Sequence, residues 1–194
     1  MKLLSALIRL NLTLLWFSTS AALAATTVEP DNEMREILQQ TISDASSFDD
    51  RFDAEVWLVD MSGRMQRYVD DPEERFKMLR LIHKEAQRVN LQPELVLSVI
   101  HVESLFDRFA ISSAGAQGLM QIMPFWKNEI GTQEDNLMDI QTNIRYGCTV
   151  LKAYLTREKG NLWRALARYN GSTGKTWYAE RVFDAWEKHW KLIH

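Results

Sequence analysis

The residue of this chain whose surroundings point most directly to chemistry is Glu103. If residues 95–103 are helical, the positions three, four and seven before it lie on the same face. Those positions hold Ile100, Val99 and Val96, so the carboxyl group would lie on the face that this helix must bury. Burial disfavours the charged form and raises the pKa of a carboxyl group, as a general acid near neutral pH requires. A Glu against apolar walls beside a sugar-binding cleft is the arrangement used in glycoside cleavage. This spacing alone also fits a Glu that pairs with a cation or caps the helix end.

Two later segments carry small and polar residues in a distinctive order. Residues 112–124 read S-S-A-G-A-Q-G-L-M-Q-I-M-P, and residues 165–172 read A-L-A-R-Y-N-G-S. Together with the Glu103-Ser104 pair, these segments closely resemble the SLT-type lytic transglycosylases, relatives of goose-type lysozyme with a lysozyme-like α fold. The resemblance covers about residues 91–182 in the family's order and spacing. It departs from the family at Arg108, where many relatives have Pro, and this puts the shape of the local loop in question.

The resemblance implies a role for each matching residue. Glu103 would be the catalytic acid and base, and Tyr169 the partner that orients it. Met120 and Gln121 would line the cleft. Asn170 and Ser112 are further, weaker cleft candidates.

The resemblance also implies a mechanism. Glu103 would protonate the oxygen of the β-1,4 bond between N-acetylmuramic acid and N-acetylglucosamine, and would then take the proton of the muramyl C6 hydroxyl as a 1,6-anhydro ring closes. Neither a second carboxylate nor a cofactor is needed, unlike the scheme of most glycosidases. Two alternatives stay open. One is a hydrolytic muramidase, for which Asp107 is the nearest second acid, although it also reads as a solvated loop residue. The other is a peptidoglycan-binding scaffold without turnover.

The composition of the chain limits the kinds of molecule that it is expected to bind. The chain of 194 residues has a formal net charge of −3, which argues against nucleic acid but is compatible with a glycan. Its four histidines show no metal-ligand spacing, so we expect no metal site. The single cysteine, Cys148, allows no intramolecular disulfide and lies in an apolar stretch, where it is expected to be a buried small hydrophobe.

The N-terminus resembles an export signal. Residues 1–24 begin with Lys2 and Arg9, continue with a short apolar run, and end in small residues at Ala24. We therefore expect a signal peptide over 1–24, a linker and N-terminal helical extension over 25–69, and the catalytic domain over 70–194. The mature protein would be periplasmic, without stable membrane insertion. Cell-envelope machinery is a possible partner.

The spacing of apolar residues predicts a mostly α fold, a compact lysozyme-like (goose-type) domain with an N-terminal helical extension. Long alternating β-branched runs are nearly absent. Short segments at 43–53 and 112–118 are expected to be loops. Of the tryptophans, Trp126 and Trp177 are the candidates for sugar-binding platforms. The expected helices cover residues 33–42, 54–69, 71–90, 92–106, 119–130, 137–157, 161–169 and 178–192.

Overall fold

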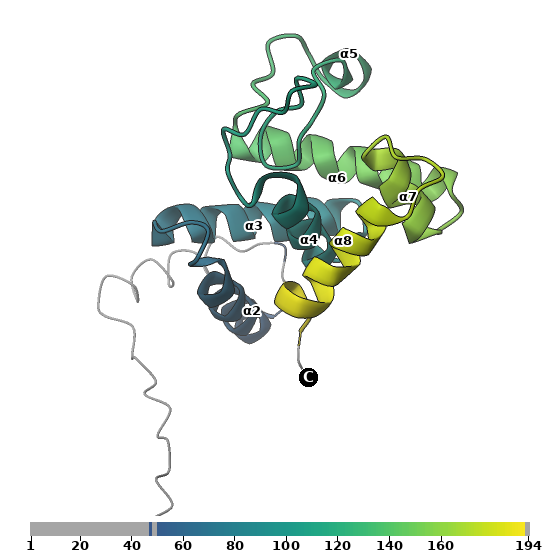
Figure 1. The fold of residues 1–194 in the computed structure, drawn as a ribbon. Coiled ribbons are helices and arrows are strands. Elements are labelled where there is room, and N and C mark those ends of the chain that lie inside the picture. The colour runs from purple at the N-terminus through teal and green to yellow at the C-terminus, as the bar shows by residue number, and fades with distance from the viewer. Residues whose placement is uncertain (1–46, 48–49, 193–194) are drawn as a thin grey trace, which may run out of the picture.

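The structure, a computed structural model, describes residue 47 and residues 50–192. In this part of the chain the regular secondary structure is helical, apart from two isolated β-bridges (Figure 1). The predicted mostly α fold is confirmed. The elements in chain order are α2 (Arg51–Met65), α3 (Pro72–Arg88), α4 (Pro93–Ser104), α5 (Trp126–Ile130), α6 (Ile140–Arg157), α7 (Leu162–Tyr169), α8 (Trp177–Ala185) and the π-helical turn η1 (Trp186–Trp190).

Local side chains explain where most of these helices begin. The Asp71 carboxylate accepts a hydrogen bond from the backbone N–H of Glu73 at 3.1 Å, with Pro72 in the first turn of α3. Asp139 caps α6 in the same way, and Asn161 caps α7. The expected helices over 71–90, 137–157 and 161–169 are therefore confirmed to within a few residues at their ends.

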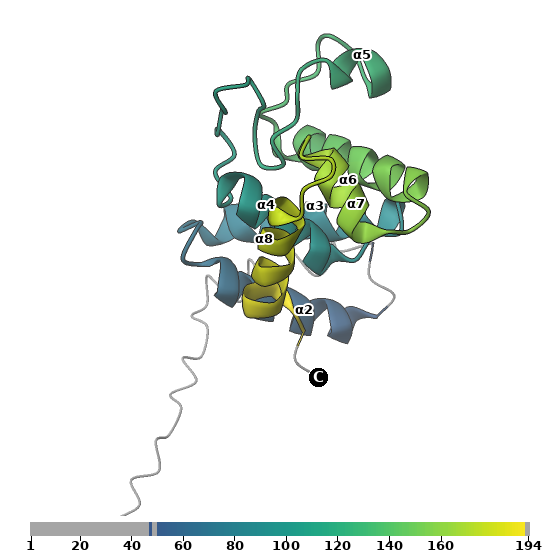
Figure 2. The same cartoon turned by 45° about the vertical axis from the view of Figure 1, so that its right-hand side comes forward.

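The catalytic candidate lies on α4, the central helix of the bundle. This helix contacts α3, α8 and η1, and Figures 1 and 2 show it next to α3 and α8. Its residues Val96, Val99 and Ile100 are fully buried, as the sequence predicted. Leu58 and Met61 on α2 belong to the same core, so side chains from before and after Asp70 pack together.

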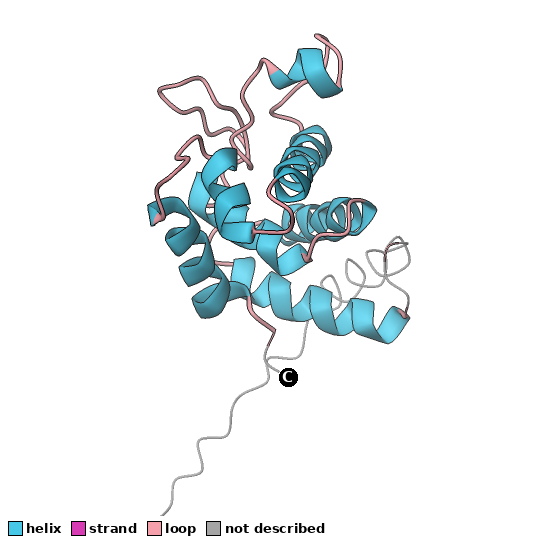
Figure 3. Cartoon of the chain, turned by 90° about the vertical axis from the view of Figure 1, so that its right-hand side faces the viewer, coloured by secondary structure: helices cyan, strands magenta, loops and turns pink. Residues whose placement is uncertain are grey.

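One long connection is mostly irregular. Between α4 and α6 the chain forms turns and loops that carry only the short α5 (Figures 2 and 3). Parts of this connection stand away from the bundle, whereas Leu119 and Met120 reach back into the core. The helix expected over 119–130 is wrong, because only Trp126–Ile130 is helical. Gly118 and Gln121 have positive φ angles of 73° and 50°, which an α-helix cannot propagate, and Gln117 pairs with Ile122 in a β-bridge instead.

The other expectations concern the C-terminal helix, Cys148, the N-terminal residues and membrane insertion. The helix predicted over 178–192 is confirmed in α8, but it ends in the π-helical η1. Cys148 is confirmed as a buried residue, and burial raises the pKa of its thiol well above the usual value. The expected signal peptide and the helix over 33–42 lie outside the described residues. Within residues 50–192, none of the helices combines the length and apolarity needed to cross a bilayer.

Candidate active site

Glu103 lies in the last turn of α4 and is half-buried beside the apolar core. Burial raises the pKa of its carboxyl group from 4.5 to about 7. Hydrogen bonds from the side chains of Tyr178 and Asn170, and the positive charge of Arg181, act against this shift by stabilising the carboxylate. The result is a group that is present in both protonation states near neutral pH. Such a group can act first as an acid and then as a base.

Tyr178 is the direct partner of the candidate acid. Its hydroxyl donates a hydrogen bond of 2.6 Å to Glu103 Oε1. The residue lies in the first turn of α8, which packs against α4, and its ring is buried. A buried Tyr normally needs a hydrogen-bond partner for its hydroxyl, and this was the one signal in the sequence that could have singled it out.

Tyr169, which the resemblance assigns as the partner that orients Glu103, makes its hydrogen bond elsewhere. Its hydroxyl donates to the backbone carbonyl of Met120 at 2.7 Å rather than to Glu103. Tyr169 ends α7 and reaches the irregular segment, whereas α8 delivers Tyr178 to the end of α4. Asn170 follows Tyr169 and does contact Glu103, as its hydrogen bond to that carboxyl group shows.

The chain reverses direction immediately after the candidate acid. Leu105 and Phe106 both have left-handed φ angles, 51° and 66°, which cost roughly 1–2 kcal/mol for each residue without compensation. The Phe106 ring compensates by packing in the core, with ring centroids 5.2 Å from Trp190 and 5.4 Å from Tyr68. The helix α4 therefore ends at Ser104, one residue after Glu103.

The segment over 117–122 is held by a network around Asn143, which is buried on α6. Its Oδ1 accepts from the Met120 N–H at 2.8 Å. Its Nδ2 donates to the carbonyls of Gln117 at 2.8 Å and Leu137 at 2.7 Å. A Cβ at Gly118 would overlap with the Asn143 amide, so this glycine is required both by its φ angle and by the close approach. Asn143 thus determines the path of the whole turn.

Met120 contributes to the site through its backbone. Its side chain is fully buried against Gly147, where a Cβ would overlap with the Met120 sulfur. Its carbonyl is the acceptor for Tyr169. Next to the acid, the Ser104 hydroxyl donates to the carbonyl of Leu119 at 2.8 Å, so α4 and the turn are joined at the site.

The other two predicted cleft residues also stabilise this irregular segment. The Gln121 amide nitrogen donates to the carbonyls of Gly118 and Ala110, at 2.9 and 3.2 Å. The Ser112 hydroxyl oxygen accepts from the Ala116 N–H at 3.0 Å. Glu103 and Asn170 are therefore in contact, and Tyr169 with Met120 supports them from one side. Gln121 and Ser112 shape the loop that follows α4.

Asp107 makes a hydrogen bond within the loop that follows Glu103. It is exposed, and its carboxylate accepts from the Phe109 N–H at 2.8 Å. This hydrogen bond fits a residue that stabilises a turn, which was one of the two interpretations of the sequence.

Removing the hydroxyl of Tyr178 tests the geometry around Glu103. The Tyr178→Phe variant loses a hydrogen bond that favours the carboxylate, so the pKa of Glu103 is expected to rise above about 7. Activity that depends on protonated Glu103 should therefore persist to higher pH, because the alkaline limb of the pH–rate profile follows this pKa. The maximal rate should fall on the order of tenfold, as the proton donor is less well oriented. The measurement is the pH–rate profile between pH 5 and about 9, a range that brackets the group.

Tyr169→Phe is the matched comparison, because it removes the hydroxyl that bonds Met120 and leaves the Tyr178 bond in place. It should lower the rate without moving the alkaline limb upward. An alkaline limb that is the same in the Tyr178→Phe variant and in the unmodified protein would contradict the assignment of Tyr178 as the partner of Glu103.

Comparison with known proteins identifies the family to which the sequence is similar. A model of the family described as "Transglycosylase SLT domain" matches residues 80–191. Membrane-bound lytic murein transglycosylase C of Haemophilus influenzae (strain PittEE) is 34% identical over 124 residues, covering 56% of this chain and 34% of that protein. A transglycosylase of Enterobacteria phage PRD1 is 37% identical over 86 residues, covering 44% and 31% of the two chains. This chain spans about a third of the length of these relatives.

Two further similarities are more limited. Membrane-bound lytic murein transglycosylase C of Actinobacillus pleuropneumoniae serotype 5b (strain L20) is 46% identical over 46 residues, which are 24% of this chain and 13% of that protein. An inactive mutant of the lytic transglycosylase Slt from Pseudomonas aeruginosa, a solved structure, superposes with a TM-score of 0.45 and 22% identity, over 78% of this chain and 33% of that one.

Proposed function

This chain belongs to the transglycosylase SLT domain family, and from that premise we propose that it is a peptidoglycan lytic transglycosylase with Glu103 as its single acid and base. The proposed reaction cleaves the β-1,4 bond between N-acetylmuramic acid and N-acetylglucosamine and leaves 1,6-anhydromuramyl ends. The observation that carries the proposal is the half-buried Glu103, with a pKa of about 7 and hydrogen bonds from Tyr178 and Asn170.

The proposed chemistry uses this carboxyl group twice. Protonated Glu103 donates its proton to the glycosidic oxygen as the bond to the muramyl C1 breaks, and the substrate's own N-acetyl group stabilises the positive charge that develops. Glu103, now a carboxylate, accepts the proton of the C6 hydroxyl as that oxygen bonds to C1. The enzyme ends the cycle protonated, and no water is consumed. A pKa near 7 suits both steps, because neither protonation state is strongly disfavoured near neutral pH.

The main alternative is hydrolysis on the same fold, with water in place of the C6 hydroxyl. That reaction needs a group to hold the water, and the nearest acid in sequence is Asp107. Its exposure and its hydrogen bond to the Phe109 N–H favour a role in the loop. Attack by the substrate's own hydroxyl is also favoured by proximity, which can contribute several kcal/mol relative to a free water.

Digestion of purified sacculi distinguishes these reactions. We expect the protein to release muropeptides that carry 1,6-anhydromuramyl ends, each lighter by one water than the product of hydrolysis and resistant to reduction by borohydride. Mass spectrometry of the products before and after borohydride treatment is the measurement. Reducible muramyl ends as the main product would make the enzyme a hydrolase and would direct attention to Asp107. Binding of sacculi without release would favour the scaffold alternative.

We also propose that the protein acts in the periplasm. The support is the sequence of residues 1–24, which has the charged, apolar and small-residue order of an export signal. Relatives named as membrane-bound murein transglycosylases are consistent with action at the cell envelope.

A further inference from the structure

The chain makes a tight turn soon after Glu103. The Ala110 N–H donates a hydrogen bond of 3.2 Å to the Asp107 carbonyl, which is the pattern of a four-residue β-turn. The Asp107 carboxylate accepts from the Phe109 N–H at 2.8 Å and stabilises the same turn through its side chain. Arg108 occupies the second position, where Pro is favoured because its ring already fixes the φ angle of the turn. An Arg lacks this restraint, so other contacts must hold the turn in place.

The Arg108 side chain joins this turn, the 107–110 turn, to the body of the bundle. Its Nη1 donates to Glu74 Oε1 at 3.3 Å, in an ion pair between residues 34 positions apart. Glu74 lies in the first turn of α3. The two side chains are 31% and 30% exposed, so solvent screens this pair less than it screens a fully exposed one. The guanidinium carbon also lies 4.9 Å from the centre of the Phe109 ring, so the two neighbouring side chains pack together.

The 107–110 turn is also bonded to the segment that carries Gln121. The Ala110 carbonyl accepts from the Gln121 amide nitrogen at 3.2 Å. At the other end of the turn, the Asp107 N–H donates to the carbonyl of Ser104 at 3.1 Å. Ser104 is the last residue of α4 and follows the candidate acid in the chain. The turn therefore connects the end of α4 to Gln121, and a shift of the turn would move Gln121 relative to the acid.

We propose that Arg108 is a positioning residue whose ion pair with Glu74 fixes the 107–110 turn. Through the turn, the ion pair sets the place of Gln121 relative to Glu103. The proposal rests on the proposed function, in which Glu103 is the acid and base, and on the resemblance that places Gln121 in the cleft. Loss of the ion pair should weaken binding of the glycan more than transfer of the proton, because the hydrogen-bond partners of the Glu103 carboxyl group come from other elements.

The place of Gln121 can be followed without turnover. In a ¹H–¹⁵N spectrum its side-chain amide signals, identified by their loss in Gln121→Glu, should shift in Arg108→Ala and in Glu74→Gln. Each variant removes one partner of the ion pair, so the two should change these signals in the same direction. Unchanged signals in either folded variant would overturn the proposal, whatever reaction the enzyme catalyses.

Kinetics on soluble glycan strands test the consequence for binding. In Arg108→Ala, KM should rise roughly three- to fivefold, which is the most that a partly exposed ion pair usually contributes, and kcat should stay within about 1.5-fold. Glu74→Gln should raise KM by a similar factor, and the double variant should be no worse than either single change, because the two residues act as one unit. If Arg108 instead bound the glycan directly, Glu74→Gln would leave KM unchanged. That result, or additive effects of the two changes, would overturn the proposal.

Arg108→Pro separates positioning from a general effect on stability. Pro restricts the second position of the turn through its own ring, and the Arg108 N–H that it removes makes no backbone hydrogen bond within residues 50–192. KM should therefore return to within about 1.5-fold of the value for the unmodified protein, although the ion pair is absent. In this background Glu74→Gln should have no further effect. A KM as high as that of Arg108→Ala would contradict positioning through the turn.

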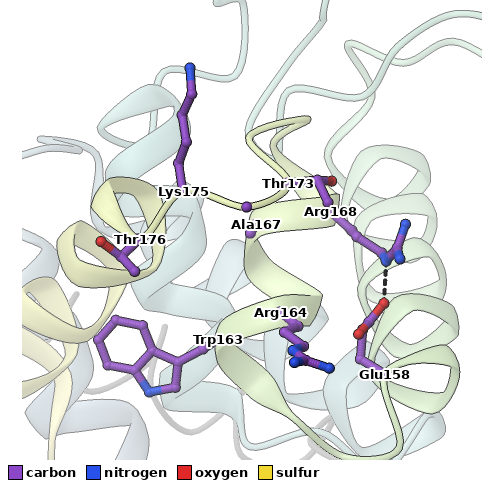
Figure 4. Close-up of a pocket in the computed structure, with 9 residues that line it drawn as sticks. Glu158, Trp163, Arg164, Ala167, Arg168, Thr173, Lys175 and Thr176 are labelled. Carbon is purple, nitrogen blue, oxygen red and sulfur yellow. Dashed lines mark hydrogen bonds and ion pairs between the residues drawn. The ribbon is translucent and has the colours of Figure 1, made fainter.

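The matched control is Arg164→Ala, which removes the same kind of side chain from an exposed position of α7. Figure 4 shows Arg164 on the wall of a pocket where the ion pair is made by Arg168 and Glu158 instead. This control should change KM by less than about 1.5-fold and leave the Gln121 signals in place. A rise as large as that of Arg108→Ala would overturn the proposal, because loss of any positive charge would then weaken glycan binding. An absence of cleavage by the unmodified protein would instead contradict the proposed function, and the spectra would then test the positioning by themselves.

Discussion

Replacing Glu103 with Gln is expected to lower the release of muropeptides by about 10²–10⁴-fold while the fold stays intact. The amide has the shape of the carboxyl group but cannot supply a proton to the glycosidic oxygen. The Tyr178 hydroxyl can still donate to the amide oxygen, so the surrounding contacts remain. The measurement is the initial rate of release from sacculi, with circular dichroism as the check on folding.

Asp107→Asn is the control for this loss. It removes a carboxylate one turn further along the chain, which is exposed and bonded to the Phe109 N–H. Its rate should stay within a few-fold of the unmodified protein if Glu103 is the only acid and base. A folded Glu103→Gln variant that keeps its turnover would exclude Glu103 from this role, and a large loss in Asp107→Asn would support the hydrolytic alternative.

The stability advantage of the same Glu103→Gln variant over the unmodified protein should also grow as the pH rises. The pKa of Glu103 is 4.5 in its ordinary environment and about 7 in the folded protein, so the unfolded chain loses this proton more readily. The unmodified protein therefore loses stability between about pH 4.5 and 7, whereas an amide does not titrate. Allowing for the partial exposure of the group, the advantage of the variant should be absent near pH 4 and reach roughly 2 kcal/mol above pH 7. Urea unfolding at three pH values measures it, and a difference that does not change with pH would contradict the raised pKa.

A second large effect is expected at Asn143, far from Glu103 in the sequence. The Asn143→Leu variant keeps a side chain of similar size but leaves the Met120 N–H and the Leu137 carbonyl without a partner, while the Gln117 carbonyl keeps the hydrogen bond from the Ile122 N–H. Each unsatisfied buried group costs about 1–3 kcal/mol, so we expect a loss of about 3–5 kcal/mol in the free energy of unfolding. Activity should fall as well, because the Met120 carbonyl supports Tyr169 beside the acid.

Gln141→Leu also replaces a side-chain amide with leucine, at an exposed position of α6, and serves as the control. Its free energy of unfolding should change by less than about 0.5 kcal/mol. Urea unfolding of both variants gives the comparison. A loss below about 1 kcal/mol in Asn143→Leu would mean that the turn over 117–122 is held by other contacts, such as the hydrogen bond from Ser104 to Leu119.

Several features of this protein could be predicted from the sequence because their causes are local. Helices begin where Asp71, Asp139 and Asn161 cap them, and each cap acts on a backbone N–H only two or three residues away. Glu103 could be placed on a buried face because the spacing of the helix relates it to residues within two turns. The family motifs are likewise short segments whose order can be followed along the chain.

The partner of Glu103 and the path of the turn were decided by the tertiary structure. Tyr178 lies 75 residues from Glu103, and only the packing of α8 on α4 brings its hydroxyl to the carboxyl group. Pro124 is a local signal against a helix through this segment. Residues 119–123 have a composition that a helix tolerates, yet Asn143 on another helix binds the backbone of the turn in a different path. Helical periodicity reports which side of a segment is buried but not which element covers it. Hydrogen bonds between distant residues depend on how whole helices pack. At this site those hydrogen bonds, rather than the local preference for helix, determine the path of the backbone.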